Sequence, residues 1–202
     1  MEFARRGRKG NLVLDQAVCR LAVTLDWDRS RDQEVEMDCD LSAFLFVGDH
    51  LNSKRDVVYF ANTCHSSKAV VHSGDNLTGW ESPENEKMHD ETITLDLKAL
   101  STKFTRYDKI IFVVSIYDAK QRGQAFDKAR NAVFRVYDED AHKLLWEFNL
   151  TKSLPGETGV KAARVYREGT VWKFQQDGTP ISSADGVSQV AKALQDFPKK
   201  DI

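Results

Sequence analysis

Carboxylate side chains are concentrated in two stretches of this chain, and both stretches are rich in the oxygen donors that a hard cation prefers. Residues 26–40 carry seven Asp or Glu opposed by two Arg, and residues 75–91 carry six opposed by one Lys. Calcium takes roughly six to eight oxygen ligands at about 2.3–2.6 Å, which loops rich in Asp, Asn and free carbonyls can supply. The two stretches therefore suit a calcium site, although acids that only solvate exposed loops would give the same composition.

The Asp38-Cys39-Asp40 triplet is the most informative part of the first stretch. In an extended strand, residues two apart project to the same side, so the two carboxylates converge while Cys39 points the opposite way, into a core. Two carboxylates at one strand end repel each other unless a cation compensates them. The triplet therefore predicts a hard-cation site wherever other oxygens lie near.

The second stretch begins with a turn-forming segment, Asp75-Asn76-Leu77-Thr78-Gly79. It offers a carboxylate, an amide oxygen, a hydroxyl and a glycine at which a carbonyl can turn inward, so it could form the other half of a cage. Neither residues 26–28 nor residues 138–140 are followed by the sixth-position Gly and twelfth-position Glu of an EF-hand loop. Any site must therefore be assembled from separate loops.

Short apolar or alternating runs recur along the chain, and their lengths are those of strands. Ile93, Leu95 and Leu97 fall on one face, as a half-buried strand requires. Residues 110–114 are apolar on both faces, which predicts a central strand covered on both sides and favours a β-sandwich over one open sheet. The predicted strands are 20–25, 42–47, 57–60, 92–97, 109–117, 132–137, 144–150, 160–166 and 171–174.

Turn-forming pairs such as Pro155-Gly156 and Asp177-Gly178 separate these runs. Helices should be few and short: residues 124–130 are one candidate, and residues 183–194, which place Val187 and Val190 on one face, are the best. We therefore predict an all-β fold with one sandwich domain over residues 1–178. A helical extension over residues 179–202 could cap this sandwich or bind a partner.

The order of motifs resembles that of the TerD family, the tellurium-resistance and stress proteins that include TerE and TerZ. Each motif is weakly specific by itself, but their order and spacing extend over most of the chain. The segments that carry the resemblance are Leu25-Asp26-Trp27-Asp28, Asp38-Cys39-Asp40-Leu41-Ser42-Ala43, Tyr59-Phe60-Ala61-Asn62, Gly74-Asp75-Asn76-Leu77-Thr78-Gly79, Asp90-Glu91-Thr92-Ile93, Ile116-Tyr117-Asp118-Ala119, Gln124-Ala125-Phe126, Phe134-Arg135-Val136, Tyr166-Arg167 and Trp172-Lys173-Phe174.

This resemblance implies a calcium-binding β-sandwich without a known reaction, in a cytoplasmic protein associated with resistance to tellurite, other chemical stress or phage. The implied partners are calcium ions and other tellurium-resistance or stress proteins, with the membrane as one place for them to meet. The implied metal ligands are Asp28, Asp38, Asp40, Asp75, Asn76, Asp90 and Glu91, with Thr78 and Gly79 as backbone contributors.

Residues 80–89 depart from the family pattern. This segment is longer than usual, contains Pro83 and has His89 where an acid is common, which puts one ligand in doubt. Trp80 lies at the start of the same segment.

Net charge and hydropathy narrow the class of function. The net charge of −2 provides no positive field that would attract nucleic acid, so no nucleic-acid partner is expected. No continuous apolar segment follows the basic N-terminus, so we expect neither a signal peptide nor a membrane span. We therefore expect the protein to be cytoplasmic. The three cysteines are far apart and form no C-x-x-C pair, which predicts reduced thiols.

An enzyme is one alternative, because paired acids such as Asp38 and Asp40 could act as general acid and base in hydrolysis. No G-x-S-x-G, H-E-x-x-H or phosphate-binding glycine loop accompanies them, so we predict a protein that is not an enzyme.

A transition-metal site built from Cys64, His65, His72 and His89 is a second alternative. The adjacent Cys64 and His65 would point apart in a strand, which favours a buried thiol beside a surface imidazole instead.

A calcium-dependent membrane or protein adaptor is a third alternative. Bound cations would neutralise the acidic loops and let them meet an anionic surface, with Trp80 as the aromatic residue that inserts.

Overall fold

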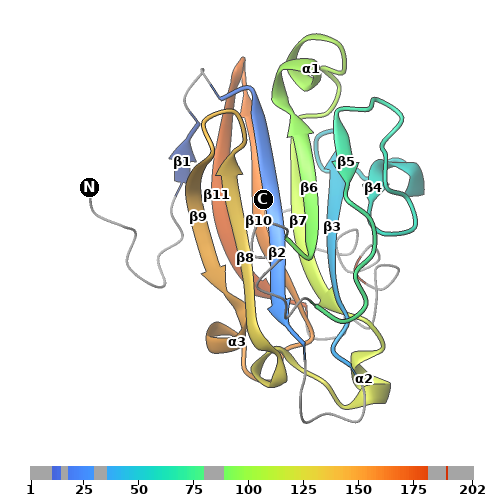
Figure 1. Cartoon of the computed structure of the whole chain (residues 1–202). Helices are drawn as coiled ribbons and strands as arrows, with labels where there is room; N and C mark the ends of the chain where they lie inside the picture. The colour runs from blue at the N-terminus through green and yellow to red at the C-terminus, as the bar shows by residue number, and fades with distance from the viewer. Residues whose placement is uncertain (1–10, 15–17, 30–35, 80–88, 182–189, 191–202) are drawn as a thin grey trace.

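Two antiparallel sheets pack as a β-sandwich, which confirms the predicted fold class (Figure 1). The computed structural model describes residues 11–14, 18–29, 36–79, 89–181 and 190. One sheet has the strand order β1-β11-β10-β7-β3-β4, and the other has the order β5-β6-β2-β8-β9. The strands are β1 (Asn11–Val13), β2 (Arg20–Asp28), β3 (Cys39–Phe46), β4 (Val57–Val58), β5 (Val70–His72), β6 (Glu91–Asp96), β7 (Lys109–Ile116), β8 (Arg130–Asp138), β9 (Lys143–Asn149), β10 (Gly159–Glu168) and β11 (Val171–Pro180).

All nine predicted strands are present, with boundaries that differ by a few residues. The one expected over 57–60 is only the two-residue β4, because Tyr59 pairs with Asn62 across a turn. β1 and β5 were not predicted, since a three-residue strand is too short to show an alternating pattern.

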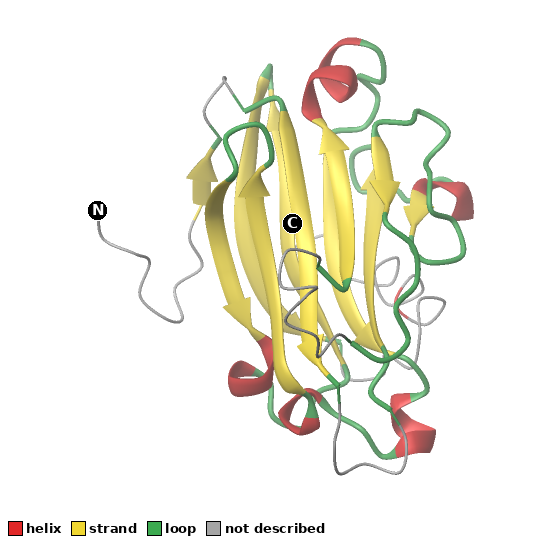
Figure 2. Ribbon diagram, viewed as in Figure 1, coloured by secondary structure: helices red, strands yellow, loops and turns green. Residues whose placement is uncertain are grey.

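Short helices join the strands at the two ends of the sandwich (Figure 2). α1 (Leu97–Thr102) lies at one end, and α2 (Ala119–Arg122) and α3 (Leu150–Ser153) lie at the other (Figure 1). The 3-10 turns are η1 (Lys54–Asp56) and η3 (Phe126–Lys128), and η3 replaces the helix expected over 124–130. Asp96 is the N-cap residue of α1: its Oδ1 accepts a hydrogen bond from Ala99 N at 2.7 Å.

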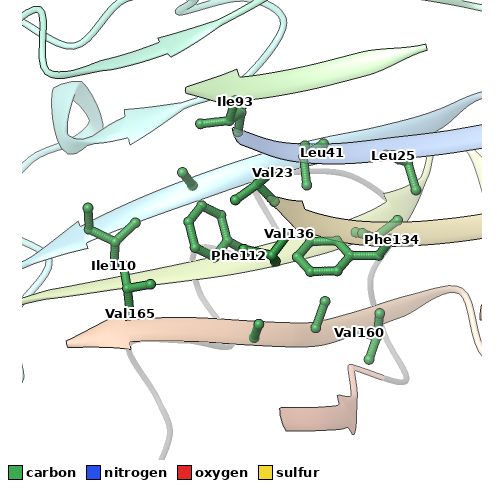
Figure 3. Packing of buried hydrophobic residues seen from close by; sticks show 14 of the residues in the cluster. Val23, Leu25, Leu41, Ile93, Ile110, Phe112, Phe134, Val136, Val160 and Val165 are labelled. Atoms are coloured by element: carbon green, nitrogen blue, oxygen red, sulfur yellow. The ribbon is translucent and has the colours of Figure 1, made fainter. Parts of the chain in front are cut away.

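The inward faces of both sheets form one hydrophobic core (Figure 3). In β6, Ile93 and Leu95 are buried while their neighbours are half-buried, as the alternating pattern predicted. Phe112 of β7 and Phe134 of β8 meet across the core with ring centres 6.4 Å apart. Burying each side chain of this size stabilises the fold by roughly 1.5–3 kcal/mol, so contacts such as this one hold the two sheets together.

The predicted central strand is β7, and it is buried on both sides. On its outer side, Val113 belongs to a second apolar cluster with Phe44 and Phe46 of β3. Ile181 and Val190, from the C-terminal part of the chain, complete that cluster and are 4% and 1% exposed. These two residues, which follow β11 in the chain, therefore cover part of the outer face of the six-stranded sheet.

β11 ends at Pro180, so residues 179 and 180 belong to the sandwich rather than to the extension predicted from residue 179. Val190 is helical, and the rest of the helix expected over 183–194 lies outside the described residues. In the parts of the chain that the structure describes, no helix is long and apolar enough to cross a membrane.

Candidate metal centre

Three carboxylates converge at the end of the sandwich where β3 begins. Asp38 and Asp40 flank the first residue of β3, and Asp75 comes from the loop that follows β5. One oxygen from each lies within 4.8 Å of the others. Because calcium lies about 2.3–2.6 Å from its ligands, two oxygens on one ion can be at most about twice that distance apart. The spacing of this carboxylate cluster, Asp38, Asp40 and Asp75, therefore suits one shared calcium ion.

The strand geometry explains why two of these carboxylates meet. Cys39, between them, is fully buried in the main core and pairs with Ile116 of β7. Burial raises the pKa of its thiol well above the ordinary value, so it acts as a small apolar group rather than as a ligand. Asp38 and Asp40 consequently project to the opposite side, as the sequence predicted.

Two oxygens of the carboxylate cluster lack a hydrogen-bond partner within the described structure. Asp38 is 6% exposed and Asp40 2% exposed, yet Asp38 Oδ1 and Asp40 Oδ2 are buried without a partner among the described residues. An unpaired buried polar atom costs about 1–3 kcal/mol, and more when it is charged. A bound cation would remove this penalty, which is a reason for such an arrangement to persist.

Burial and like charges also perturb the acidity of the cluster. The pKa of Asp38 is raised from 3.8 to about 7, first by burial and then by Asp75, while Arg122 opposes the shift. The pKa of Asp40 is raised to about 8 by burial and by the nearby Glu91 and Asp38. Both shifts arise first from burial and then from neighbouring carboxylates, and a bound dication would favour the ionised form of both groups.

Glu91 lies next to the cluster and joins the two sheets. Its Oε2 accepts a hydrogen bond from Leu41 N of β3 at 2.6 Å and lies 3.4 Å from His72 Nε2. His72 Nδ1 accepts from Gly74 N at 3.0 Å, so Nε2 carries the proton and donates to Leu41 O at 3.2 Å. These side chains satisfy the backbone of β3 at a position that β4 does not reach. Glu91 Oε1 is buried and unpaired within the described structure.

Asn76 shapes the loop that presents Asp75. Its Oδ1 accepts hydrogen bonds from Thr78 N and Gly79 N, each at 3.2 Å, and its Nδ2 donates to Asp90 Oδ1 at 2.9 Å. Gly79 has φ of +72°, and a Cβ there would lie 2.4 Å from the carbonyl oxygen of Trp27. Asn76, Gly79 and Asp90 therefore organise the loop through contacts within the protein.

Two other acids of the first stretch are used elsewhere. Asp28 Oδ2 accepts a hydrogen bond from Asn131 Nδ2 at 2.6 Å, on the side of β2 that faces β8. Asp26 binds His89 Nδ1 at 2.9 Å and Arg135 Nη1 at 2.7 Å. The unusual His89 thus pairs with an acid outside the cluster, and Asp28 is not brought to it.

The structure adds residues that sequence reasoning did not assign to the site. A cavity of about 510 Å³ opens beside the cluster; besides the predicted Thr78, its further lining residues are Glu36, Phe60, Leu77, Tyr117 and Arg122. Tyr117 is adjacent because its N donates to Asp38 O at 2.9 Å where β7 ends beside the start of β3. The sequence signal was the Ile116-Tyr117-Asp118-Ala119 motif, which indicated the family but not this position.

The transition-metal alternative finds no support in the geometry. Cys64 is exposed and His65 is 1% exposed, the reverse of the prediction, because His65 Nε2 lies 3.3 Å from the buried Asp56 and its Nδ1 lies 2.7 Å from Ser67 Oγ. Within the described residues, the carboxylate cluster is the one group of three or more potential metal ligands. Trp80 and Pro83 lie outside the described residues.

Comparison with known proteins gives consistent matches. The TerD domain family model matches residues 5–193. General stress protein 16U of Bacillus subtilis is 32% identical over 189 residues, which cover 92% of this chain and 93% of that protein. Tellurium resistance protein TerD of Serratia marcescens is 31% identical over 173 residues, which cover 84% of this chain and 86% of that protein.

A solved structure agrees with the fold. The crystal structure of a homologue of telluride resistance protein (TerD) from Streptomyces coelicolor superposes with a TM-score of 0.66 at 20% identity, and the match covers 81% of this chain and 90% of that one. At this identity the likeness bears on the sandwich alone.

Proposed function

The chain belongs to the TerD family, and from that premise we propose that it is a calcium-binding, non-enzymatic module of a tellurium-resistance or chemical-stress response. The observation that carries the calcium proposal is the carboxylate cluster of Asp38, Asp40 and Asp75. Its oxygens lie close enough to share one ion, and two of them are buried without a hydrogen-bond donor in the described structure.

The donor set favours calcium over other ions. All three ligands are carboxylates, and no His or Cys side chain lines the cavity within the described residues, which disfavours zinc and copper. Asp75 is exposed and comes from a loop, so the cage can adjust to the larger ion. Magnesium requires near-octahedral geometry at about 2.0–2.1 Å and releases water reluctantly, so it should compete weakly.

The lining of the cavity supports a binding role rather than a catalytic one. Its one hydroxyl on an aliphatic side chain, that of Thr78, donates to Gly79 O at 3.4 Å rather than to a carboxylate in the part of the chain that the structure describes. A nucleophile activated by a neighbouring base is the usual sign of covalent catalysis. We therefore infer that the protein acts by recruiting other tellurium-resistance or stress proteins. We propose the cytoplasm as the place where it does so.

Calorimetry of the whole chain tests the binding proposal. After chelator treatment, titration with calcium should give saturable binding, while magnesium at the same concentration should give little heat. Calcium should also raise the unfolding temperature, because a ligand that binds only the folded state stabilises it. Asp38→Asn should abolish both effects, and an unaltered response in this variant would overturn the site assignment.

A growth assay tests the proposed biological role. Cells that lack the gene should regain tellurite resistance when wild-type protein is supplied, but not when Asp38→Asn is supplied at equal abundance. Full rescue by the variant would separate resistance from calcium binding. Affinity capture in calcium and in chelator would then compare which stress proteins associate with the loaded form.

A further inference from the structure

The cavity beside the carboxylate cluster has an apolar wall that calcium binding by itself does not require. Leu77 is 58% exposed and Tyr117 is 39% exposed, and they are two of the four large apolar side chains that are exposed in the described part of the chain. Phe60, which is half-buried, lines the same cavity. Exposed apolar groups gathered around a hollow indicate a surface that a ligand covers.

Arg122 brings a positive charge to the same wall. Its guanidinium carbon lies 5.2 Å from the centre of the Tyr117 ring, and its Nη1 donates to Glu36 O at 3.5 Å. That is the one hydrogen bond of the Arg122 side chain within the described residues, although a guanidinium has five N–H donors. The Glu36 carboxylate is instead bound by Arg29 Nε at 2.9 Å. Arg122 can therefore donate to an acceptor that enters the cavity.

The charges define what kind of acceptor fits. The carboxylate cluster contributes −3, which calcium (+2) and Arg122 (+1) would offset; of the neighbouring acids, Glu36 pairs with Arg29, and Glu91 lies 3.4 Å from His72. A ligand with one negative charge then adds the least repulsion while still pairing with Arg122. Three carboxylates also fill only part of the roughly six to eight positions around calcium, so oxygens of a ligand can occupy others.

We propose that the calcium-loaded cavity binds a small organic carboxylate with an apolar or aromatic body. The ligand's carboxylate meets the ion and Arg122, and its body packs on Leu77, Tyr117 and Phe60. The cavity volume of about 510 Å³ suits a small molecule rather than a folded partner. This inference rests on the calcium binding proposed above.

Protein NMR of the isotope-labelled chain tests the proposal in two stages. Calcium is added first, and its saturable binding is established by calorimetry. The loaded protein is then titrated with 3-phenylpropionate as the probe, with the uncharged 3-phenylpropanol as the control. We expect saturable chemical-shift changes at Leu77 and Tyr117 with the carboxylate. The alcohol should bind at least about tenfold more weakly, because a charge-assisted pair is lost. The carboxylate should cause no shift changes in chelator.

Matched variants separate the site from general effects. Arg122→Gln and Leu77→Ser should each weaken probe binding by about tenfold or more. Leu77→Ser removes no charge and should leave calcium affinity unchanged, whereas Arg122→Gln removes a positive charge near Asp38 and should tighten calcium binding. Arg20→Gln and Leu144→Ser are the controls, since both residues are exposed and lie outside the cavity lining. Both controls should bind the probe as wild type does.

The outcomes distinguish this inference from the function on which it rests. Calcium binding without a response to 3-phenylpropionate would overturn the ligand assignment and leave the calcium proposal standing. Absence of calcium binding would overturn both. Calcium-dependent sedimentation with phosphatidylglycerol vesicles, in the absence of any response to the free carboxylate, would assign the apolar wall to a membrane instead and would also refute the proposal.

Discussion

Replacing Asp40 with Asn should have opposite effects on stability and on calcium binding. Asp40 is 2% exposed, and its Oδ2 has no hydrogen-bond partner within the described structure. The substitution removes a buried negative charge but keeps the size of the side chain, and the new amide can donate to Asp38. Asp40→Asn should therefore stabilise the calcium-free protein while it weakens the calcium site.

The magnitude follows from the pKa of Asp40, which is 3.8 ordinarily and about 8 in the folded protein. As pH rises past 4, the unfolded chain releases this proton while the folded chain retains it, so wild-type stability falls until about pH 8. One pKa unit corresponds to about 1.4 kcal/mol, so the penalty approaches about 5 kcal/mol at pH 8 and about 2 kcal/mol at pH 5. Structural relaxation and water entry make the real penalties smaller than these upper limits. We therefore expect Asp40→Asn to raise the free energy of unfolding by about 2–4 kcal/mol at pH 8.

Urea unfolding in chelator at pH 5 and pH 8 measures this gain directly. The advantage of Asp40→Asn over wild type should grow with pH, while calcium should raise the unfolding temperature of wild type by several degrees more than that of the variant. Asp75→Asn is the comparison: Asp75 is exposed, so its loss should weaken calcium binding but, by relieving only its repulsion of Asp38 and Asp40, should stabilise the chelated protein less than Asp40→Asn does. If Asp40→Asn destabilises the chelated protein at pH 8, the carboxylate has a favourable partner and the reasoning fails.

Three further predictions follow from neighbouring residues. Asp28→Asn should leave calcium affinity within about twofold of wild type by calorimetry, because Asp28 is hydrogen-bonded to Asn131 of β8. A tenfold loss of affinity, about 1.4 kcal/mol, would place Asp28 in the site. Gly79→Ala should destabilise the protein by about 2–4 kcal/mol in urea unfolding, because φ is +72° and the added Cβ meets Trp27 O, and wild-type stability would contradict the loop geometry. Glu91→Ala should cost about 1–3 kcal/mol by leaving Leu41 N without its acceptor, while Glu91→Gln should retain most of that stability; equal losses would argue against this bond.

Much of the site was predictable because local geometry set it. The spacing of Asp38 and Asp40 determines that their carboxylates share one side of a strand and that Cys39 points to the core, whatever the rest of the fold does. The turn chemistry of Asn76 and Gly79 likewise depends on residues within the same loop. In the same way, alternation and run length were sufficient to identify nine strands of the sandwich and the double burial of β7.

The tertiary structure alone decided which acids work together. Asp28 and Asp75 look equivalent in the sequence, but β8 binds the first while the loop after β5 carries the second to β3. Arg122 and Tyr117 join the cavity because β7 ends beside the start of β3, a pairing between residues far apart in the chain. The assignment of His65 to a buried network depended on Asp56 and Ser67 in the same way. The position of a residue along its strand therefore determines which side of the sheet it faces, whereas the pairing of strands that are distant in sequence determines which residues it contacts there.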